Sequence, residues 1–203
     1  MTYILCFLKA PRIGYVKTRL AQDIGLESAL HVYRTLVERQ LSELPLGAHK
    51  EIHYTPSGTI GKMRNWLGDE YTFYPQCEGG LGRRLECAVT DAFKRGAKRV
   101  ICIGGDCPKL NQAYFEQTTA ALQNDFDVVF GPSEDGGYYL VGLNAPHVKL
   151  FQNIPWSTTA TLEASLKKTS ALNLRVKLLD KLYDVDKVAE LNRAVEDGLI
   201  NNQ

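Results

Sequence analysis

Short apolar runs and longer segments with helical spacing alternate along the whole of this chain. The apolar runs predict strands at Tyr3–Leu8, Lys50–Tyr54, Tyr71–Tyr74, Val100–Ile103, Val128–Phe130, Tyr138–Leu143 and Val176–Leu179. The helical spacing predicts helices at Leu26–Leu44, Ile60–Leu67, Gly82–Arg95, Asn111–Leu122, Ser157–Leu172 and Val188–Asp197, with caps at Asn111 and at Ser157 or a following threonine. This alternation is typical of an α/β fold, a mostly parallel sheet with helices on both faces. Because no linker or repeat interrupts it, we expect residues 1–203 to form a single domain.

Composition and charge narrow the class of protein. Hydrophobic residues make up 44% of the 203 and charged residues 23%, which is ordinary for a globular protein. A formal net charge of +1 provides no broad positive field, so nucleic acid is not an expected partner. The apolar runs are too short to span a membrane, and the first one indicates a strand rather than a signal peptide. The five cysteines lack the spacing of a zinc site and indicate reduced thiols in a cytoplasmic protein.

A buried strand followed by Gly-Gly-Asp is the most informative local feature. The strand Val100–Ile103 is apolar and mostly β-branched, and Gly104, Gly105 and Asp106 follow it. Open α/β sheets bind ligands at the carboxyl ends of their strands, where these glycines would let a phosphate approach the backbone. A carboxylate at this edge suits Mg²⁺ or Mn²⁺ bridging to a diphosphate. Asp106 is equally typical of a helix cap, so both roles stay open.

Four basic residues lie in the loop that follows the first strand. Lys9, Arg12, Lys17 and Arg19 lie within KAPRIGYVKTRL, residues 9–20. Together with the backbone amides at the start of the next helix, they would form a cradle for a polyphosphate. The loop lacks the spacing of a P-loop and of the dinucleotide-binding motif. A solvated basic loop is the alternative, and Lys17 and Arg19 are the strongest phosphate-binding candidates.

A glycine-rich connection, PQCEGGLGRRL, follows the third predicted strand at residues 75–85. Its glycines, Gly79 and Gly80 among them, allow a tight turn against a flat ligand. Gln76 offers both donors and acceptors to the edge of a nucleotide base. Taken alone, this loop is weak evidence for nucleotide binding.

Neighbouring carboxylates and aromatic rings occur together after the fifth predicted strand. Glu134 and Asp135 precede Gly136, Gly137 and Tyr138. Two adjacent carboxylates in different environments can act as a general base and as an electrostatic stabiliser, whereas Asp-Gly is also a common surface turn. We favour a functional role for this pair because aromatic faces near carboxylates are common in sugar pockets.

Three further side chains are candidates near the end of the chain. Asp184 and Asp186 are two positions apart, so in extended backbone both point to the same side, where one of them could join Asp106 on a metal. Either aspartate could equally cap the last helix. Trp156, in IPWST, suits stacking against an acceptor and core packing equally well.

Six segments of the chain, taken in order, resemble motifs of one protein family. They are KAPRIGYVKTRLA, PQCEGGLGRRL, IGGDCPKL, DVVFGPSEDGGYYLVGL, IPWST and LYDVD. The family consists of small bacterial GT-A-like proteins, catalogued as an uncharacterised domain and often labelled glycosyltransferase, within the nucleotide-diphospho-sugar transferase superfamily. The resemblance covers nearly the whole chain. It implies a three-layer α/β/α fold that binds a nucleoside diphosphate sugar and a divalent metal.

The resemblance also implies roles for individual residues. Asp106 matches the metal aspartate, and Asp184 or Asp186 matches a second acidic position. Lys17 and Arg19 match the phosphate loop. The base-contacting loop corresponds to Gln76 and to the turn Gly79–Gly80, and the loop Glu134–Tyr138 would face the acceptor.

From these features we expect an enzyme that transfers sugar from a nucleoside diphosphate sugar to a small acceptor. Mg²⁺ or Mn²⁺ on Asp106 would neutralise the leaving diphosphate, helped by Lys17 and Arg19. Glu134 or Asp135 would be the general base if the reaction inverts the anomeric centre. A nucleotidyltransferase that releases pyrophosphate and a non-catalytic nucleotide-binding module are the alternatives. The acceptor, the donor and the oligomeric state are not specified by the sequence.

Overall fold

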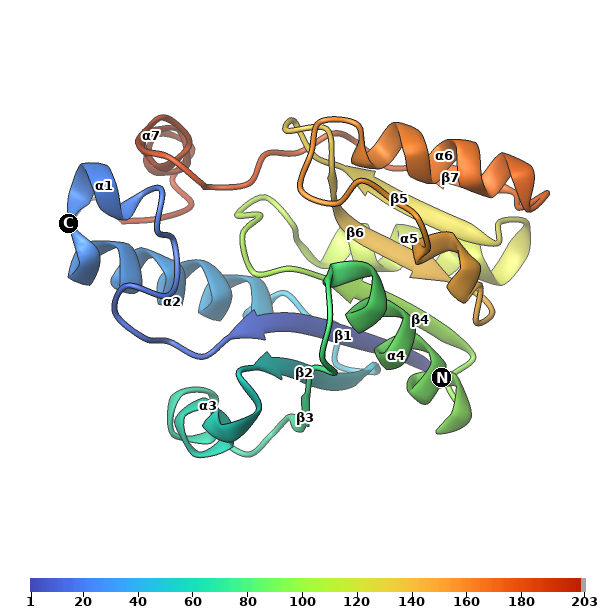
Figure 1. The fold of residues 1–203 in the computed structure, drawn as a ribbon, viewed down its shortest axis with the longest axis horizontal. Coiled ribbons are helices and arrows are strands. Elements are labelled where there is room, and N and C mark those ends of the chain that lie inside the picture. Colours follow the sequence, from blue (N-terminus) through green and yellow to red (C-terminus); the bar gives the residue numbers. More distant parts are fainter. Residues whose placement is uncertain (202–203) are drawn as a thin grey trace.

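A computed structural model describes residues 1–201, which contain one seven-stranded sheet (Figure 1). The strand order is β3-β2-β1-β4-β6-β5-β7, and β6 runs antiparallel to its neighbours while the other pairs are parallel. The strands are β1 (Thr2–Lys9), β2 (His49–Thr55), β3 (Thr72–Pro75), β4 (Arg99–Ile103), β5 (Val128–Pro132), β6 (Tyr138–Leu143) and β7 (Val176–Leu178). The predicted α/β class with a mostly parallel sheet is therefore confirmed.

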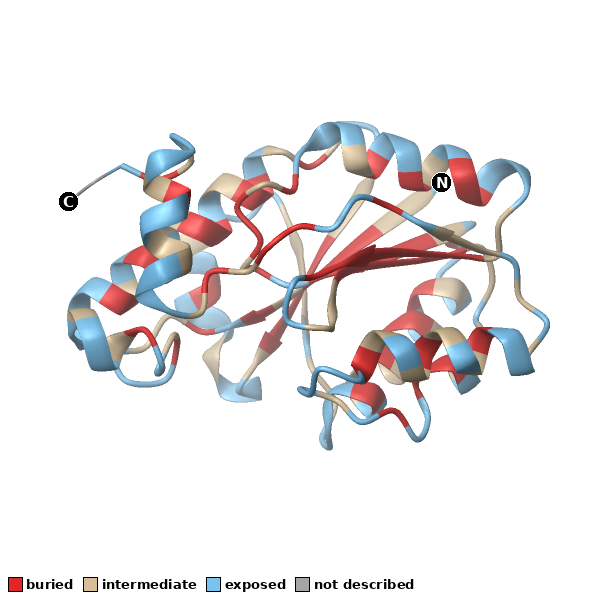
Figure 2. Cartoon of the chain, turned by 90° about the horizontal axis from the view of Figure 1, so that it is seen from above, coloured by how far each residue is buried: buried red, intermediate tan, exposed pale blue. Residues whose placement is uncertain are grey.

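Helices cover both faces of the sheet and complete the three layers (Figure 2). The helices are α1 (Ala21–Ile24), α2 (Leu26–Ser42), α3 (Ile60–Leu67), α4 (Leu81–Lys94), α5 (Gln112–Asn124), α6 (Thr161–Ala171) and α7 (Val188–Glu196), with short 3₁₀ turns η1 (Ser57–Thr59) and η2 (Val148–Phe151). Because side chains alternate along a strand, Ile4 of β1 packs in the core with α2, α3 and α5, whereas Leu5 packs in the core with α4 and η2. None of these helices is long and apolar enough to cross a membrane.

A third, smaller core holds the segment before α7 beside the sheet edge. Tyr183 and Val185 are buried there with Leu20 and with Ala194 of α7. The Val185 amide donates to the Asp106 carbonyl over 3.0 Å. The segment that carries two predicted acidic residues is thus held against the carboxyl end of β4.

The prediction that Ser157 or a following threonine begins and caps a helix was wrong. Helix α6 begins at Thr161, and its N-cap residue, Ala160, has no side-chain hydrogen bond. Ser157 has a left-handed φ of 61°. The hydroxyls of Thr158 and Thr161 both donate to the Pro155 carbonyl at 2.8 Å, so they stabilise a turn that competes with helix. By contrast, the predicted cap of α5 at Asn111 is confirmed.

Candidate functional site

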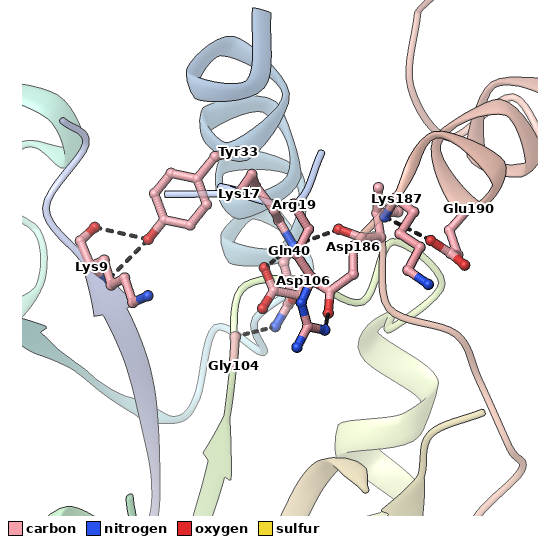
Figure 3. A network of polar contacts seen from close by, with 11 residues as sticks. Lys9, Lys17, Arg19, Tyr33, Gln40, Gly104, Asp106, Asp186, Lys187 and Glu190 are labelled. Atoms are coloured by element: carbon pink, nitrogen blue, oxygen red, sulfur yellow. Dashed lines mark hydrogen bonds and ion pairs between the residues drawn. The ribbon is translucent and has the colours of Figure 1, made fainter. Parts of the chain in front are cut away.

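A buried lysine and an aspartate meet at the carboxyl edge of the sheet (Figure 3). Asp106 follows β4, and Lys17 reaches it from the loop after β1, with its Nζ 2.5 Å from the Asp106 Oδ1. The same Nζ donates to the Val185 carbonyl at 2.6 Å and lies 3.4 Å from the Asp186 Oδ1. Lys17 therefore joins three segments that are far apart in the sequence.

The surroundings of Lys17 keep it charged. Its side chain is only 4% exposed. Burial alone lowers the pKa of Lys17, but the carboxylate of Asp106, with those of Asp186 and Asp184, outweighs burial and raises the pKa. The predicted phosphate-loop lysine is thus a permanent cation beside the predicted metal aspartate.

Carboxylates surround one cavity of about 300 Å³ next to this ion pair. Asp106, Asp135, Asp184 and Asp186 all line it, although they come from three different loops. Burial and repulsion from Asp106 and Asp135 raise the pKa of Asp184 to about 7. Within residues 1–201, Asp184 forms no hydrogen bond or ion pair, and the charge of the nearby Lys17 offsets the effects of burial and repulsion only in part.

The helix-capping alternatives for these aspartates find no support. The N-cap of α5 is Asn111, five residues beyond Asp106. The N-cap of α7 is Lys187, whose amide donates to the Glu190 carboxylate at 2.7 Å (Figure 3). Neither helix start needs Asp106, Asp184 or Asp186.

The donor set suits a hard divalent cation. Across the part of the chain that the structure describes, no group of three or more ligating side chains forms a ready-made metal cage. Mg²⁺, however, is commonly held by one or two carboxylates, with substrate phosphates and water completing its shell. The unpaired Asp184 beside Asp106 supplies the oxygens and the excess negative charge for such a shared site.

Within residues 1–201, the other basic residues of the first loop form no ion pair with Asp106. Arg19 is 71% exposed on its side chain and lies 3.6 Å from the Asp186 Oδ2. Arg12 lies over the Tyr15 ring, 4.0 Å from its centroid. The backbone of Lys9 is held at both its amide and its carbonyl by the Tyr33 hydroxyl, at 2.9 and 2.8 Å. Tyr33 was not predicted as a site residue, since its spacing in α2 indicates only a core position.

The glycine-rich connection is tied to the strand ends by Gln76. Its Nε2 donates to the carbonyls of Leu8 (3.4 Å) and His53 (2.7 Å), and its Oε1 accepts from Arg84 at 3.3 Å. Gln76 thus uses both ends of its amide inside the protein, although it was predicted to contact a base. Gly79 has a left-handed φ of 111°, which favours glycine there.

The two glycines after β4 have different surroundings. A Cβ on Gly105 would lie 2.8 Å from side-chain atoms of both Leu8 and Val37, so core packing requires this glycine. A Cβ on Gly104 would meet nothing within 4 Å, and Gly104 lines the cavity. The close approach to phosphate that was predicted for Gly105 fits Gly104 better.

The structure separates the two neighbouring acids of the loop after β5. Glu134 turns to α7 and accepts two hydrogen bonds from Arg193 Nη1, at 3.0 and 2.9 Å. Asp135 lines the cavity, and its Oδ1 accepts from the Ser133 hydroxyl and from the Gly137 amide. A Cβ on Gly136 would collide with the main chain of residue 159, so this turn requires glycine.

Aromatic side chains line the same cavity as the carboxylates. Trp156 and Tyr138 both line the cavity, with ring centroids 6.0 Å apart in an edge-to-face arrangement. A Cβ on Gly82 of α4 would lie 2.5 Å from the Trp156 Nε1, so the indole fits against this helix only because residue 82 is glycine. The predicted acceptor residues Tyr138, Trp156 and Gly137 thus share one cavity with Asp135.

Comparisons with known proteins identify a family and structures of similar fold. The family described as "Uncharacterized protein conserved in bacteria (DUF2064)" matches residues 43–158. A crystal structure from Desulfovibrio desulfuricans G20, provisionally named a nucleotide-diphospho-sugar transferase, is 32% identical with a TM-score of 0.91, covering 100% of this chain and 89% of that one. No curated protein matches the sequence.

More distant structures share the fold. The inositol-1-phosphate CTP transferase from T. maritima has a TM-score of 0.60 and 14% identity, covering 98% of this chain and 95% of that one. The manganese complex of Rv0371C from Mycobacterium tuberculosis H37Rv has a TM-score of 0.54 and 13% identity, covering 96% and 98%. At such identities the likeness shows the fold alone. The family match and the Desulfovibrio relative together place this chain in the DUF2064 family, with a nucleotide-diphospho-sugar transferase-like fold, as the six sequence motifs predict.

Proposed function

We propose that this protein is a nucleotide-using transferase that moves a sugar from a nucleoside diphosphate sugar to a small acceptor. One observation carries the proposal: the Lys17–Asp106 ion pair lies at the carboxyl edge of the sheet, beside an acid-lined cavity with an aromatic wall. That edge is where open α/β sheets bind nucleotides. The name of the Desulfovibrio relative supports the same donor class.

The chain's cations bind and orient the diphosphate. Lys17 is held between Asp106 and Val185, so its charge is fixed before the donor arrives. Lys9, Arg12 and Arg19 extend the positive charge along the same loop. Asp106, with Asp184 or Asp186, would hold Mg²⁺ or Mn²⁺, whose charge offsets that of the departing diphosphate. A distant protein of this fold is described as a manganese complex.

Asp135 is the better candidate for the general base. It lines the cavity, whereas Glu134 is engaged by Arg193. With Oδ1 held by Ser133 and Gly137, the second oxygen, which has no hydrogen bond within residues 1–201, is free to take the acceptor's proton in an inverting reaction.

Thermal unfolding with nucleoside diphosphates and their sugars, with and without Mn²⁺, tests the proposal. A donor at 100 times its dissociation constant stabilises the folded state by about 2.7 kcal/mol. We expect this gain in the unaltered protein and its loss in Asp106→Asn. Glu134→Gln and Asp135→Asn should both keep donor binding, and only Asp135→Asn should lose transfer. No nucleotide-dependent stabilisation in any of these conditions would refute the proposal.

Nucleotidyl transfer is the second candidate, because a protein of this fold is named an inositol-1-phosphate CTP transferase. The same loops could bind a nucleoside triphosphate. Release of pyrophosphate from a triphosphate, with no turnover of any diphosphate sugar, would establish this reaction in place of sugar transfer.

A further inference from the structure

The cavity contains no positive charge for an anionic acceptor. None of the described residues that line it is lysine, arginine or histidine, whereas four aspartates do line it. Of the nearby cations, Lys17 binds the diphosphate of the donor in the proposed reaction, and Arg193 is held by Glu134. A phosphorylated acceptor brings a charge of about −1.5 to −2 and requires charge-assisted donors. No lysine, arginine or histidine in the described lining could supply them.

Part of the cavity lining is apolar. Phe7, Leu81 and Leu85 line it together with Trp156. The indole packs against the helix at Gly82, so it presents its surface without reorganising. A volume of about 300 Å³ is at the lower end for ligand pockets, which fits a body of one ring.

One polar group in this lining is unsatisfied. Tyr138 lines the cavity, and its hydroxyl is buried without a hydrogen-bond partner in residues 1–201. The hydroxyl of Ser165 donates instead to the Thr161 carbonyl at 2.9 Å. Because the Tyr138 hydroxyl is fully buried beside Ser165 of α6, Tyr138 contributes its ring, and not its hydroxyl, to the lining of the cavity.

We infer that the acceptor is an alcohol without an anionic group and with a compact apolar or aromatic body, bound between Trp156 and Asp135. The inference rests on the proposed function and specifies its second substrate. The acceptor oxygen bonds to the anomeric carbon of the donor as the bond from that carbon to the diphosphate oxygen breaks. The hydroxyl proton passes to Asp135, and the nucleoside diphosphate leaves. No other reactant is required.

Two ligands that share a six-membered aromatic ring but differ in charge test the inference: benzyl alcohol and phenyl phosphate. The chain has two tryptophans, so Trp66→Phe leaves Trp156 as the only indole to report binding by fluorescence. Trp66 lies on α3 and bonds to Glu38, away from the cavity lining. Ligand-observed NMR on the unaltered protein provides a check that is independent of this variant.

We expect benzyl alcohol to bind at least about tenfold more tightly than phenyl phosphate, a difference of about 1.4 kcal/mol. In Thr158→Lys, which adds a cation to the lining, phenyl phosphate should gain affinity while benzyl alcohol should not. Equal or tighter binding of phenyl phosphate to the unaltered cavity would overturn the inference. Absence of any response would overturn it too.

Nucleotide-dependent stabilisation, measured on the same preparations, separates the two proposals. If nucleotides bind and benzyl alcohol does not, only the choice of acceptor is wrong. If benzyl alcohol binds and no nucleotide does, the proposed transferase function fails while the preference of the cavity for a ligand without an anionic group stands.

Discussion

Replacing Lys17 by methionine tests whether this lysine organises the site. The change keeps the length of the side chain and removes its charge. At 2.5 Å, the gross attraction to the Asp106 Oδ1 is about 7 kcal/mol with an effective dielectric constant of about 20. Most of this is offset by the desolvation of the buried ammonium, and removing one partner of a buried pair typically costs about 3–5 kcal/mol.

The net loss should be smaller, because the carboxylates left behind can be hydrated. The side chains of Asp106 and Asp186 are 44% and 47% exposed. We therefore expect Lys17→Met to lose about 2 kcal/mol of folding free energy, below the range for fully buried pairs. For a chain of this length that corresponds to a fall in Tm of roughly 4–8 °C.

Arg19→Met is the matched control. Arg19 comes from the same loop and contacts the same Asp186, but its side chain is 71% exposed and the distance is 3.6 Å. Such surface pairs contribute about 0–1 kcal/mol, so its Tm should fall by less than roughly 4 °C. Equal losses in the two variants would refute the conclusion that Lys17 is the organising cation.

Lys17→Met also tests the metal site. Without Lys17, Asp106, Asp184 and Asp186 lack their compensating charge, so Mn²⁺ should raise the Tm of Lys17→Met more than that of the unaltered protein. A smaller or equal rise would show that these carboxylates do not form the cation site.

The sequence predicts the fold well where burial repeats with a clear period. Val100–Ile103 and Tyr138–Leu143 are buried on both faces, so their apolar runs identify them as strands. The antiparallel direction of β6 could not be predicted, because it depends on pairing with β4 and β5 and not on local residues. The turn at Ser157 was missed because threonine hydroxyls bond to Pro155 locally.

Only the site residues that directly follow predicted strands could be placed together from the sequence. Asp106 and Lys17 follow strands, so topology alone brings them to one edge. Glu134 and Asp135 could not be distinguished, because Arg193, the partner that draws Glu134 away, lies 59 residues further along the chain. Likewise, nothing near Gln76 in the sequence indicates that its amide is used by strand carbonyls.

Three further outcomes are expected. Gly136→Ala should destabilise the protein by about 1–3 kcal/mol in urea titrations, because φ is 90° and the new methyl group would meet Thr159; an unchanged midpoint would contradict this geometry. Mild peroxide should oxidise Cys77 and Cys87 to a disulfide, detected by mass spectrometry after alkylation, since their sulfurs lie 2.6 Å apart; full alkylation of both would contradict it. Asp184→Asn should stabilise the metal-free protein increasingly as the pH rises. The pKa of Asp184 is raised to about 7 in the folded protein, so its ionisation opposes folding, and stability is lost from about pH 4 upward until the loss levels off above pH 7. Asp184→Asn can raise the free energy of unfolding by at most roughly 4 kcal/mol, and solvent screening at this half-buried position makes the increase smaller. A difference in unfolding free energy between the two proteins that does not change between pH 4 and pH 8 would mean that Asp184 is already compensated, and the argument for a cation at this edge would lose its basis.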